Sequence, residues 1–466
     1  MKTITFILLL FVSTVSVAND TFSYTLEKHQ KFEKTFSFAV ENATIHLIIV
    51  KNKDTKKYDL IPFYMDSQQK VNQFETSSFE DIPEIVAYHT NGDIVSISTF
   101  QDKTVAVLDY NLQNGSVLEN TWESKDKPVI KFIDDTKTRY LESTDKETLE
   151  LTTITTSADV QTKKISVSKE FQKTIKEIFK EPVSIVDNQN FVKHGAISEI
   201  QGYFNDETIY FTFYDYFQKD TPELLTVDIA TGTISKKPIL QDVLEKPTDF
   251  NAHIVDDKLF ASFLTKEDLL FQVYDAKTGS VEQSHTLNGT LSQLRTIKGK
   301  RLAYLKKTKR FKFKSTVSVN KTQDNNYAVV VDVVNRDTYH YYDWFWLHTM
   351  MFNQQMMLNM GMPGGFGPKD FITEDVINYW ASEDSIPLEF VLDANFKLLP
   401  DHNGATQKKY VDKEKYAKQL AENKTVFNSS IGFLENEYRY IYTNKDEDVV
   451  TIKTKPIKRR VRSNRK

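Results

Sequence analysis

Short apolar runs alternate with polar turns along most of the chain, at the spacing of β-hairpins. The pattern is clearest in two segments that start 47 residues apart, Thr226–Ile234 and Val273–Val281. Each consists of an apolar strand that ends in Asp, a turn closed by Thr-Gly, and a strand that opens with Thr or Ser and then Ile or Val. Asp accepts hydrogen bonds from nearby backbone N–H groups, and Gly adopts the positive φ that such a turn needs. We therefore predict that Gly232 and Gly279 lie at equivalent turns in adjacent units of a repeat.

Looser copies of this unit flank the two segments. The aspartates that end an apolar run, and that we expect to be turn residues, are Asp109, Asp228, Asp275, Asp332 and Asp393. Further hairpins are predicted with turns near Asp54, Asp159 and Asn444, which makes eight candidate hairpins. If each hairpin is the outer half of a four-stranded unit, the chain has about one hairpin per unit.

Self-similarity at a period of about 40–50 residues is typical of β-propellers. The strand-Asp-x-x-Thr-Gly turns at 228–232 and 275–279 resemble the repeats of YVTN and pyrroloquinoline-quinone propellers, over about two blades. The Trp that usually follows in the quinone type is missing, because Lys237 and Gln283 occupy that region. The resemblance therefore implies no quinone, and we expect no cofactor. We predict an all-β fold, a β-propeller of seven or eight blades; a sandwich or stacked sheets is the alternative.

Two segments depart from the strand pattern. Phe171, Ile175 and Ile178 follow Ser168 at helical spacing, and Pro182 ends the run. Residues 412–423 show a weaker helical pattern. We expect one or two short helices that pack between blades.

The first 18 residues have the features of a secretory signal peptide. Lys2 precedes an apolar run from Ile4 to Val12, and Ser16 and Ala18 are small residues at a cleavage position. The run is shorter than the roughly 20 apolar residues of a membrane span, although an anchor stays the alternative. We predict a mature chain from Asn19, exported to the periplasm, cell surface or medium of a bacterium and without stable membrane insertion. With no cysteine in the chain, stability has to come from the core rather than from disulfides.

Charge is unevenly distributed along the chain, whose formal net charge is −4. We expect one propeller-like domain over 19–455 and a basic, disordered tail over 456–466, which contains Lys458, Arg459, Arg460, Arg462, Arg465 and Lys466. Such a tail can bind polyanions. Because it lacks interleaved aromatic residues and follows an acidic body, we do not predict nucleic-acid binding.

No motif points to catalysis. The chain has no Gly-x-Ser-x-Gly elbow, phosphate-binding loop, His-Glu-x-x-His or dinucleotide fingerprint. Its nine histidines are scattered, without metal-ligand spacing on a common helix. We predict no catalytic residue.

One segment, 340–371, differs from the rest in composition, since it holds six of the eight methionines. We predict an insertion that projects between two repeat units. Its candidate partner-binding residues are Trp344, Trp346, Met350, Met351, Phe352, Met356, Met357, Met360, Met362 and Phe366. Methionine adapts to varied apolar partners, and aromatic rings supply large contact areas.

Two other interpretations of this segment stay open. It can form a hydrophobic helix that packs against the propeller, or a soft-metal site for Cu(I) with His348, Met357, Met360 and Met362 as ligands. The favoured function is an exported, non-enzymatic binding or scaffolding protein of the cell envelope, whose partner is an unknown protein or envelope component. An enzyme with its active site in the propeller funnel is the alternative.

Overall fold

A computed structural model of the protein describes residues 21–124, 130–134, 136–180, 183–186, 195–214, 221–239, 247–310, 312–322, 324–335, 385–399, 416, 419–420 and 423–457. Three sequence predictions lie outside these residues: the signal peptide, the insertion at 340–371, and all but the first two residues of the basic tail.

The described residues form seven mainly antiparallel β-sheets. Sheet 1 contains β2 (Gln30–Val40), β3 (Ala43–Asn52), β4 (Tyr58–Met65), β5 (Val71–Gln73) and β6 (Ser77–Phe79). Sheet 2 contains β7 (Glu84–Asn91), β8 (Ile94–Gln101), β9 (Thr104–Asn111) and β10 (Val117–Glu123). Sheet 3 contains β11 (Ile130–Ile133), β12 (Thr138–Ser143), β13 (Thr148–Thr156) and β14 (Asp159–Ser166).

The second half of the chain repeats this arrangement. Sheet 4 contains β15 (Val183–Ile185), β16 (Ile200–Asn205), β17 (Thr208–Phe213), β18 (Glu223–Asp228) and β19 (Thr233–Pro238), with β15 parallel to β16. Sheet 5 contains β20 (Asp249–Val255), β21 (Lys258–Leu264), β22 (Leu269–Asp275) and β23 (Val281–Thr286). Sheet 6 contains β24 (Phe313–Lys321), β25 (Tyr327–Asn335) and β26 (Leu388–Leu392). Sheet 7 contains β27 (Phe427–Phe433), β28 (Glu437–Thr443), β29 (Val449–Pro456) and β1 (Thr21–Thr25).

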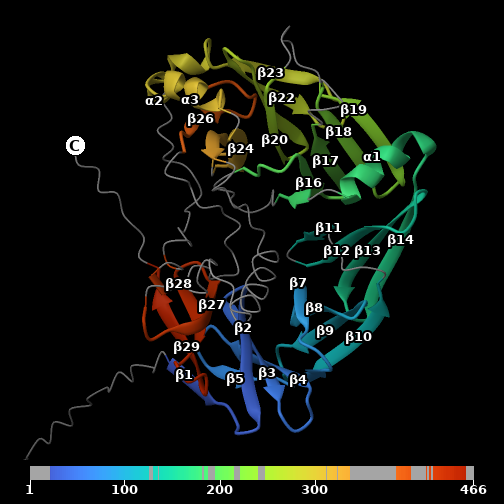
Figure 1. Ribbon diagram of the computed structural model, residues 1–466, viewed down its shortest axis with the longest axis vertical. Helices are drawn as coiled ribbons and strands as arrows, with labels where there is room; N and C mark the ends of the chain where they lie inside the picture. Colours follow the sequence, from blue (N-terminus) through green and yellow to red (C-terminus); the bar gives the residue numbers. More distant parts are fainter. Residues whose placement is uncertain are drawn as a thin grey trace, which may run out of the picture.

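The sheets follow one another around a ring in chain order (Figure 1). The ring is joined by its ends, because β1 pairs with β29, with Thr21 opposite Lys453 and Thr25 opposite Val449. Phe22 and Tyr24 of β1 also pack on Phe63 of sheet 1, at ring-centroid distances of 5.6 and 5.1 Å. Consecutive meander sheets closed by pairing of the first and last strands are the architecture of a β-propeller, as predicted.

Apolar side chains fill the spaces between neighbouring sheets rather than one central core. Separate buried clusters lie between sheets 7 and 1, across sheets 1 to 3, between 3 and 4, between 4 and 5, and between 5 and 6. Sheets 1 to 5 therefore bury both faces against their neighbours, which explains the nearly continuous burial of strands such as β3 and β20.

The predicted equivalence of Gly232 and Gly279 is confirmed. Gly232 lies between β18 and β19, the last two strands of sheet 4, and Gly279 lies between β22 and β23, the last two strands of sheet 5. Their φ angles are 71° and 79°. In both turns, the Gly N–H donates to the carbonyl oxygen of the Asp four residues earlier.

Two of the predicted turn aspartates are wrong. Asp109 lies inside β9, where it is buried and accepts hydrogen bonds from Ser96 Oγ and from the backbone N–H of Ser157 in sheet 3, both at 2.6 Å. Asn111 takes the turn position instead, since its side chain accepts from the N–H of Gln113 at 2.8 Å.

The second error is Asp332, which is buried within β25. Its carboxylate accepts hydrogen bonds from Ser385 Oγ at 2.5 Å and from the N–H of Ile386 at 2.8 Å. Asp393 is a turn residue as predicted, because it accepts from the N–H groups of Asn395 and Lys397 at 2.8 Å.

The predicted hairpins near Asp54, Asp159 and Asn444 are confirmed as the β3–β4, β13–β14 and β28–β29 turns. Only the Asp159 hairpin is the outer half of its sheet. The other two join the second and third strands, so the proposed count of one outer hairpin per unit is wrong.

The helix predicted after Ser168 is confirmed as α1 (Lys169–Lys180), which buries Ile175 and Ile178 between sheets 3 and 4. A 3₁₀ turn, η1 (Leu291–Gln293), and two helices, α2 (Arg295–Lys298) and α3 (Arg301–Thr308), were not predicted. In the weak helical segment at 412–423, Tyr416 and Leu420 are buried against sheet 7. None of the helices in the described ranges has the length and apolar character of a membrane span.

Candidate functional site

Polar residues alternate along β20, the first strand of sheet 5 and the one nearest the middle of the ring in Figure 1. Asp249, Asn251 and His253 have exposed fractions of 4%, 3% and 1%. Because side chains two residues apart in a strand share a face, the three form one buried polar row. Buried polar groups raise the free energy of the folded state unless they are hydrogen-bonded.

Two members of the row bind the backbone of β24 in sheet 6. The Asp249 carboxylate accepts from the N–H of Ser315 at 2.8 Å and is 3.1 Å from the ammonium group of Lys314. Asn251 Oδ1 accepts from the N–H of Val317 at 2.9 Å. These side chains thereby join the first strands of sheets 5 and 6, which are not paired by a backbone ladder.

The chain that precedes sheet 4 is attached to the same place. The carbonyl oxygen of Ala196 accepts from Asn251 Nδ2 at 2.7 Å and from Gln201 Nε2 at 3.1 Å. At Gly195 a Cβ atom would lie 2.1 Å from the carbonyl oxygen of Val317, so only glycine fits there. The backbone at 195–196 is thus fixed against the first strands of sheets 5 and 6.

A small pocket lies where sheet 4 and the segment before it meet β20 of sheet 5 and β24 of sheet 6. Its polar lining residues are Ser198, Glu199, Gln201, Thr212, Tyr214, Asn251 and Lys314, and Ile197 and Phe250 complete it. The pocket combines a cation, a carboxylate, amides and hydroxyls. It can therefore donate hydrogen bonds to a polar group and accept them from it, on a scaffold fixed by hydrogen bonds between the sheets.

Two of the buried histidines, His46 and His253, are kept in the neutral form by their surroundings. Burial lowers the pKa of His253 to about 3, and its ring nitrogens have no hydrogen-bond partner among the described residues. Burial and the positive charge of Arg439 lower the pKa of His46 to about 3, and its ring bonds Ser37 Oγ and Thr44 Oγ1. Within the described ranges, no group of three His, Cys, Asp or Glu could hold a metal ion.

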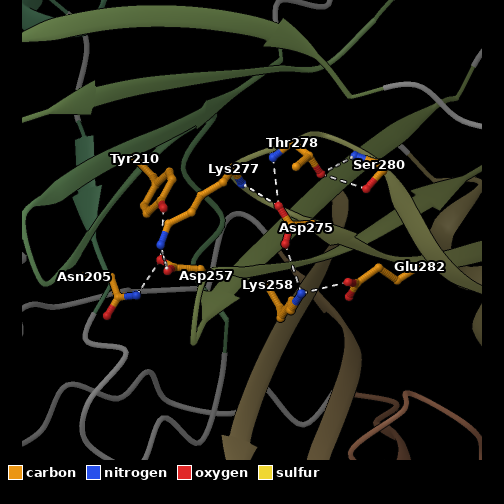
Figure 2. Close-up of polar contacts among 9 residues, drawn as sticks. All are labelled: Asn205, Tyr210, Asp257, Lys258, Asp275, Lys277, Thr278, Ser280 and Glu282. Atoms are coloured by element: carbon orange, nitrogen blue, oxygen red, sulfur yellow. Dashed lines mark hydrogen bonds and ion pairs between the residues drawn. The ribbon is translucent and has the colours of Figure 1, made fainter.

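A charged network surrounds the turns of sheets 4 and 5 (Figure 2). In one half, Asp257 receives hydrogen bonds from Asn205 Nδ2 at 2.5 Å and Tyr210 Oη at 3.0 Å, and it pairs with Lys277. In the other half, Lys258 lies 3.1 Å from Asp275 and 2.7 Å from Glu282. The first half links the two sheets, because Asn205 and Tyr210 belong to sheet 4.

Asp275 is the most strongly shifted carboxyl in this network. Partial burial alone would raise its pKa, but the N–H of Thr278 at 2.8 Å and the ammonium group of Lys258 hold the pKa at about 2. Every charged group in the network has an oppositely charged partner within it, and we assign the half around Asp257 to the attachment of sheet 4 to sheet 5.

The site residues predicted from the sequence lie outside the described residues. The candidate partner surface from Trp344 to Phe366 and the alternative metal set with His348 stay predictions. The polar row and the pocket were missed, because their residues come from 195–214, 249–253 and 314, and no local motif joins these segments.

No protein-family model matches the chain, and no curated protein matches it either. Among solved structures it is similar to the β-propeller domain of the Trilobed protease from Pyrococcus furiosus, with 8% identity and a TM-score of 0.31, over 93% of this chain and 97% of that one. It is also similar to the Dos1 propeller, with 10% identity and a TM-score of 0.30, over 66% and 72%.

A third similarity is to the cobalt-substituted apocarotenoid oxygenase of Synechocystis, with 12% identity and a TM-score of 0.28. It covers 56% of this chain and 63% of the oxygenase, which is less than two thirds of that enzyme's length. Scores this low add nothing to the fold assignment, which rests on the seven sheets and their closure.

Proposed function

We propose that the protein is an exported, non-enzymatic binding or scaffolding propeller of the cell envelope, and that the pocket between sheets 4, 5 and 6 receives a polar group of its partner. Support for the binding role comes from the propeller fold and from the pocket. Support for export comes from the sequence of residues 1–18 alone.

The observation that carries the binding proposal is the way the pocket is held in place. Asn251 contacts Ala196 on one side and Val317 on the other, so one side chain joins the segment before sheet 4 to the first strands of sheets 5 and 6, and all three contribute residues to the pocket. A binding site that is rigid before its ligand arrives loses less conformational entropy on binding. The mixture of donors and acceptors in the lining selects a polar group over an apolar one.

Photo-crosslinking in cells tests the binding proposal. Glu199 lines the pocket and is exposed, so a photoreactive residue can replace it without disturbing the core. Lys146, exposed in the turn between β12 and β13, is the matched control position. We expect a discrete adduct from position 199 and none from position 146.

The Thr212→Val substitution then checks that the adduct depends on the pocket. Valine keeps the shape of threonine but lacks its hydroxyl group, so the adduct at position 199 should weaken. Absence of any adduct at 199, or the same adduct at 146, would show that the pocket does not receive a partner. Export is tested separately by N-terminal sequencing, which should start at Asn19; an intact Met1 in a membrane fraction would contradict it.

A further inference from the structure

The segment between sheets 5 and 6 carries an extreme positive charge. From Gln283 to Gln323 the chain has no Asp or Glu but eleven Lys and Arg residues. Since the whole chain has a formal net charge of −4, the remainder carries −15. A difference of this size creates a strong local positive potential on an acidic molecule.

The structure places most of these charges on α2 and α3 and the turn that follows. Figure 1 shows the two helices at the edge of the ring, beside sheets 5 and 6. Leu294, Ile297, Tyr304 and Leu305 attach them to the core, and Tyr304 Oη lies 2.8 Å from Ser315 Oγ. The helices are therefore firmly seated, and their other face is directed to solvent.

The outward face forms one continuous stripe. Gly299 and Lys300, between the two helices, and Lys309, after them, all have right-handed helical dihedrals. Helical spacing therefore continues across the break, and exposed residues recur every three or four positions. The members of the stripe are Arg295, Lys298, Leu302, Lys306 and Lys309.

The central member of the stripe is apolar. Leu302 is 71% exposed, the largest exposed fraction among the exposed large hydrophobic residues of the described chain. The four cations that flank it make no salt bridge with a described carboxylate. The stripe thus combines unpaired positive charges with a leucine side chain whose transfer out of water lowers the free energy.

We propose that this stripe docks the protein on the surface of an anionic phospholipid bilayer. Lysine and arginine near such a surface are attracted to the headgroups, and an apolar side chain on the same helical face inserts at the headgroup boundary. The exposed leucine favours a bilayer over a nucleic acid, because phosphates and sugars offer it no apolar environment. This inference does not depend on the pocket or on its partner.

Sedimentation with vesicles tests the proposal on the mature chain. The probes are vesicles of phosphatidylglycerol mixed with phosphatidylcholine, and vesicles of phosphatidylcholine alone. The stripe variant combines R295Q, K298Q, K306Q and K309Q. The control variant has the same net charge and combines K146Q, K176Q, K266Q and K445Q, at exposed lysines elsewhere on the ring.

We expect binding to the anionic vesicles only, and weaker binding at high salt. Each lysine or arginine near an anionic surface contributes about fivefold in affinity, so the stripe variant should bind at least about tenfold more weakly. The control variant should retain most of the affinity. Leu302→Ser, made alone, should weaken binding relative to the wild type without changing the salt dependence of binding.

Two results would overturn the proposal. One is equal loss of binding in the stripe and control variants, which would indicate a general charge effect. The other is tighter binding to a double-stranded DNA probe than to anionic vesicles, with no effect of Leu302→Ser, which would assign the stripe to nucleic acid. Circular dichroism of each variant checks that the fold is intact.

Discussion

Lys163, in the outer strand of sheet 3, donates a hydrogen bond over 2.8 Å to the carbonyl oxygen of Ala230, in the last turn of sheet 4. The same contact recurs one sheet further on, where Lys237 of β19 donates to the carbonyl oxygen of Lys277 in the last turn of sheet 5. Ala230 and Lys277 occupy the same position of the Asp-x-x-Thr-Gly turn. The repeated turn therefore has a second role beyond reversing the chain, because it receives a lysine from the preceding sheet.

Substitution of either turn glycine, Gly232 or Gly279, should destabilise the protein because both residues have a positive φ. At Gly232 no atom lies within 4 Å of the place that a Cβ atom would take, so Gly232→Ala introduces only the strain of its positive φ. We expect a loss of about 1 kcal/mol in the free energy of unfolding. Gly299→Ala is the control, since Gly299 also has open space but a φ of −72°. Urea denaturation should show that variant to be as stable as the wild type or slightly more stable.

Gly195→Ala should have a larger effect. The added methyl group would lie 2.1 Å from the carbonyl oxygen of Val317 and 2.6 Å from its carbonyl carbon, so the backbone at 195–196 has to move away from β24. We expect a loss of several kcal/mol, on the order of 3 kcal/mol, as for other clashes in well-packed positions. A melting temperature equal to that of Gly299→Ala would contradict the close approach.

Stability should depend on pH through His253. Its pKa is about 3 in the folded protein, against an ordinary value of 6.5, so between these values the unfolded chain binds a proton that the folded protein does not. The folded state is therefore fully favoured above about pH 6.5 and loses stability as pH falls toward 3, by on the order of 4 kcal/mol for one such group. His253→Leu should reduce this dependence without abolishing it, as measured by thermal unfolding across the range, because the pKa of His46 is also lowered to about 3.

A second pH effect should appear at lower pH. The folded-state pKa of Asp275 is about 2, below the ordinary value of 3.8, so its stabilising effect is complete above about pH 4 and is lost as pH falls toward 2. Because the side chain is only partly buried, the effect is smaller than the full shift implies and should be about 1 kcal/mol. Asp275→Asn should reduce the pH dependence in this window without abolishing it, because the pKa values of Asp228 and Asp257 are lowered as well. The same slope in wild type and variant would show that the Lys258 pair contributes nothing.

Closure of the ring by β1 can be tested by removing it. A chain that begins at Leu26 lacks Phe22 and Tyr24, which cover Phe63, and leaves the edge of β29 unpaired. We expect a loss of roughly 2–4 kcal/mol in chemical denaturation, from two partly buried aromatic side chains. Phe22→Ala should give a smaller loss of the same sign. An unchanged midpoint for the shortened chain would mean that β1 does not contribute to closure.

The parts of the fold that could be predicted from the sequence are those encoded within a few residues. The turns at Gly232 and Gly279 combine an acceptor side chain and a positive-φ glycine within five positions, so their structure is local. Asp109 was wrongly predicted because its decisive partner, the N–H of Ser157, lies 48 residues away in another sheet. The pocket depends on similar long-range contacts, such as Asn251 with Val317, 66 residues apart.

Order of synthesis gives the β1–β29 pair a further consequence. Thr25 is made 424 positions before its partner Val449, so β1 has no strand to pair with until the chain is nearly complete. Until then Phe63 lacks its cover, and β1 is an unpaired strand open to pairing with other chains. A chain that stops before Val449 therefore keeps the Phe63 side chain and the unpaired β1 strand exposed. Its exposed apolar surface then distinguishes it from the full-length protein.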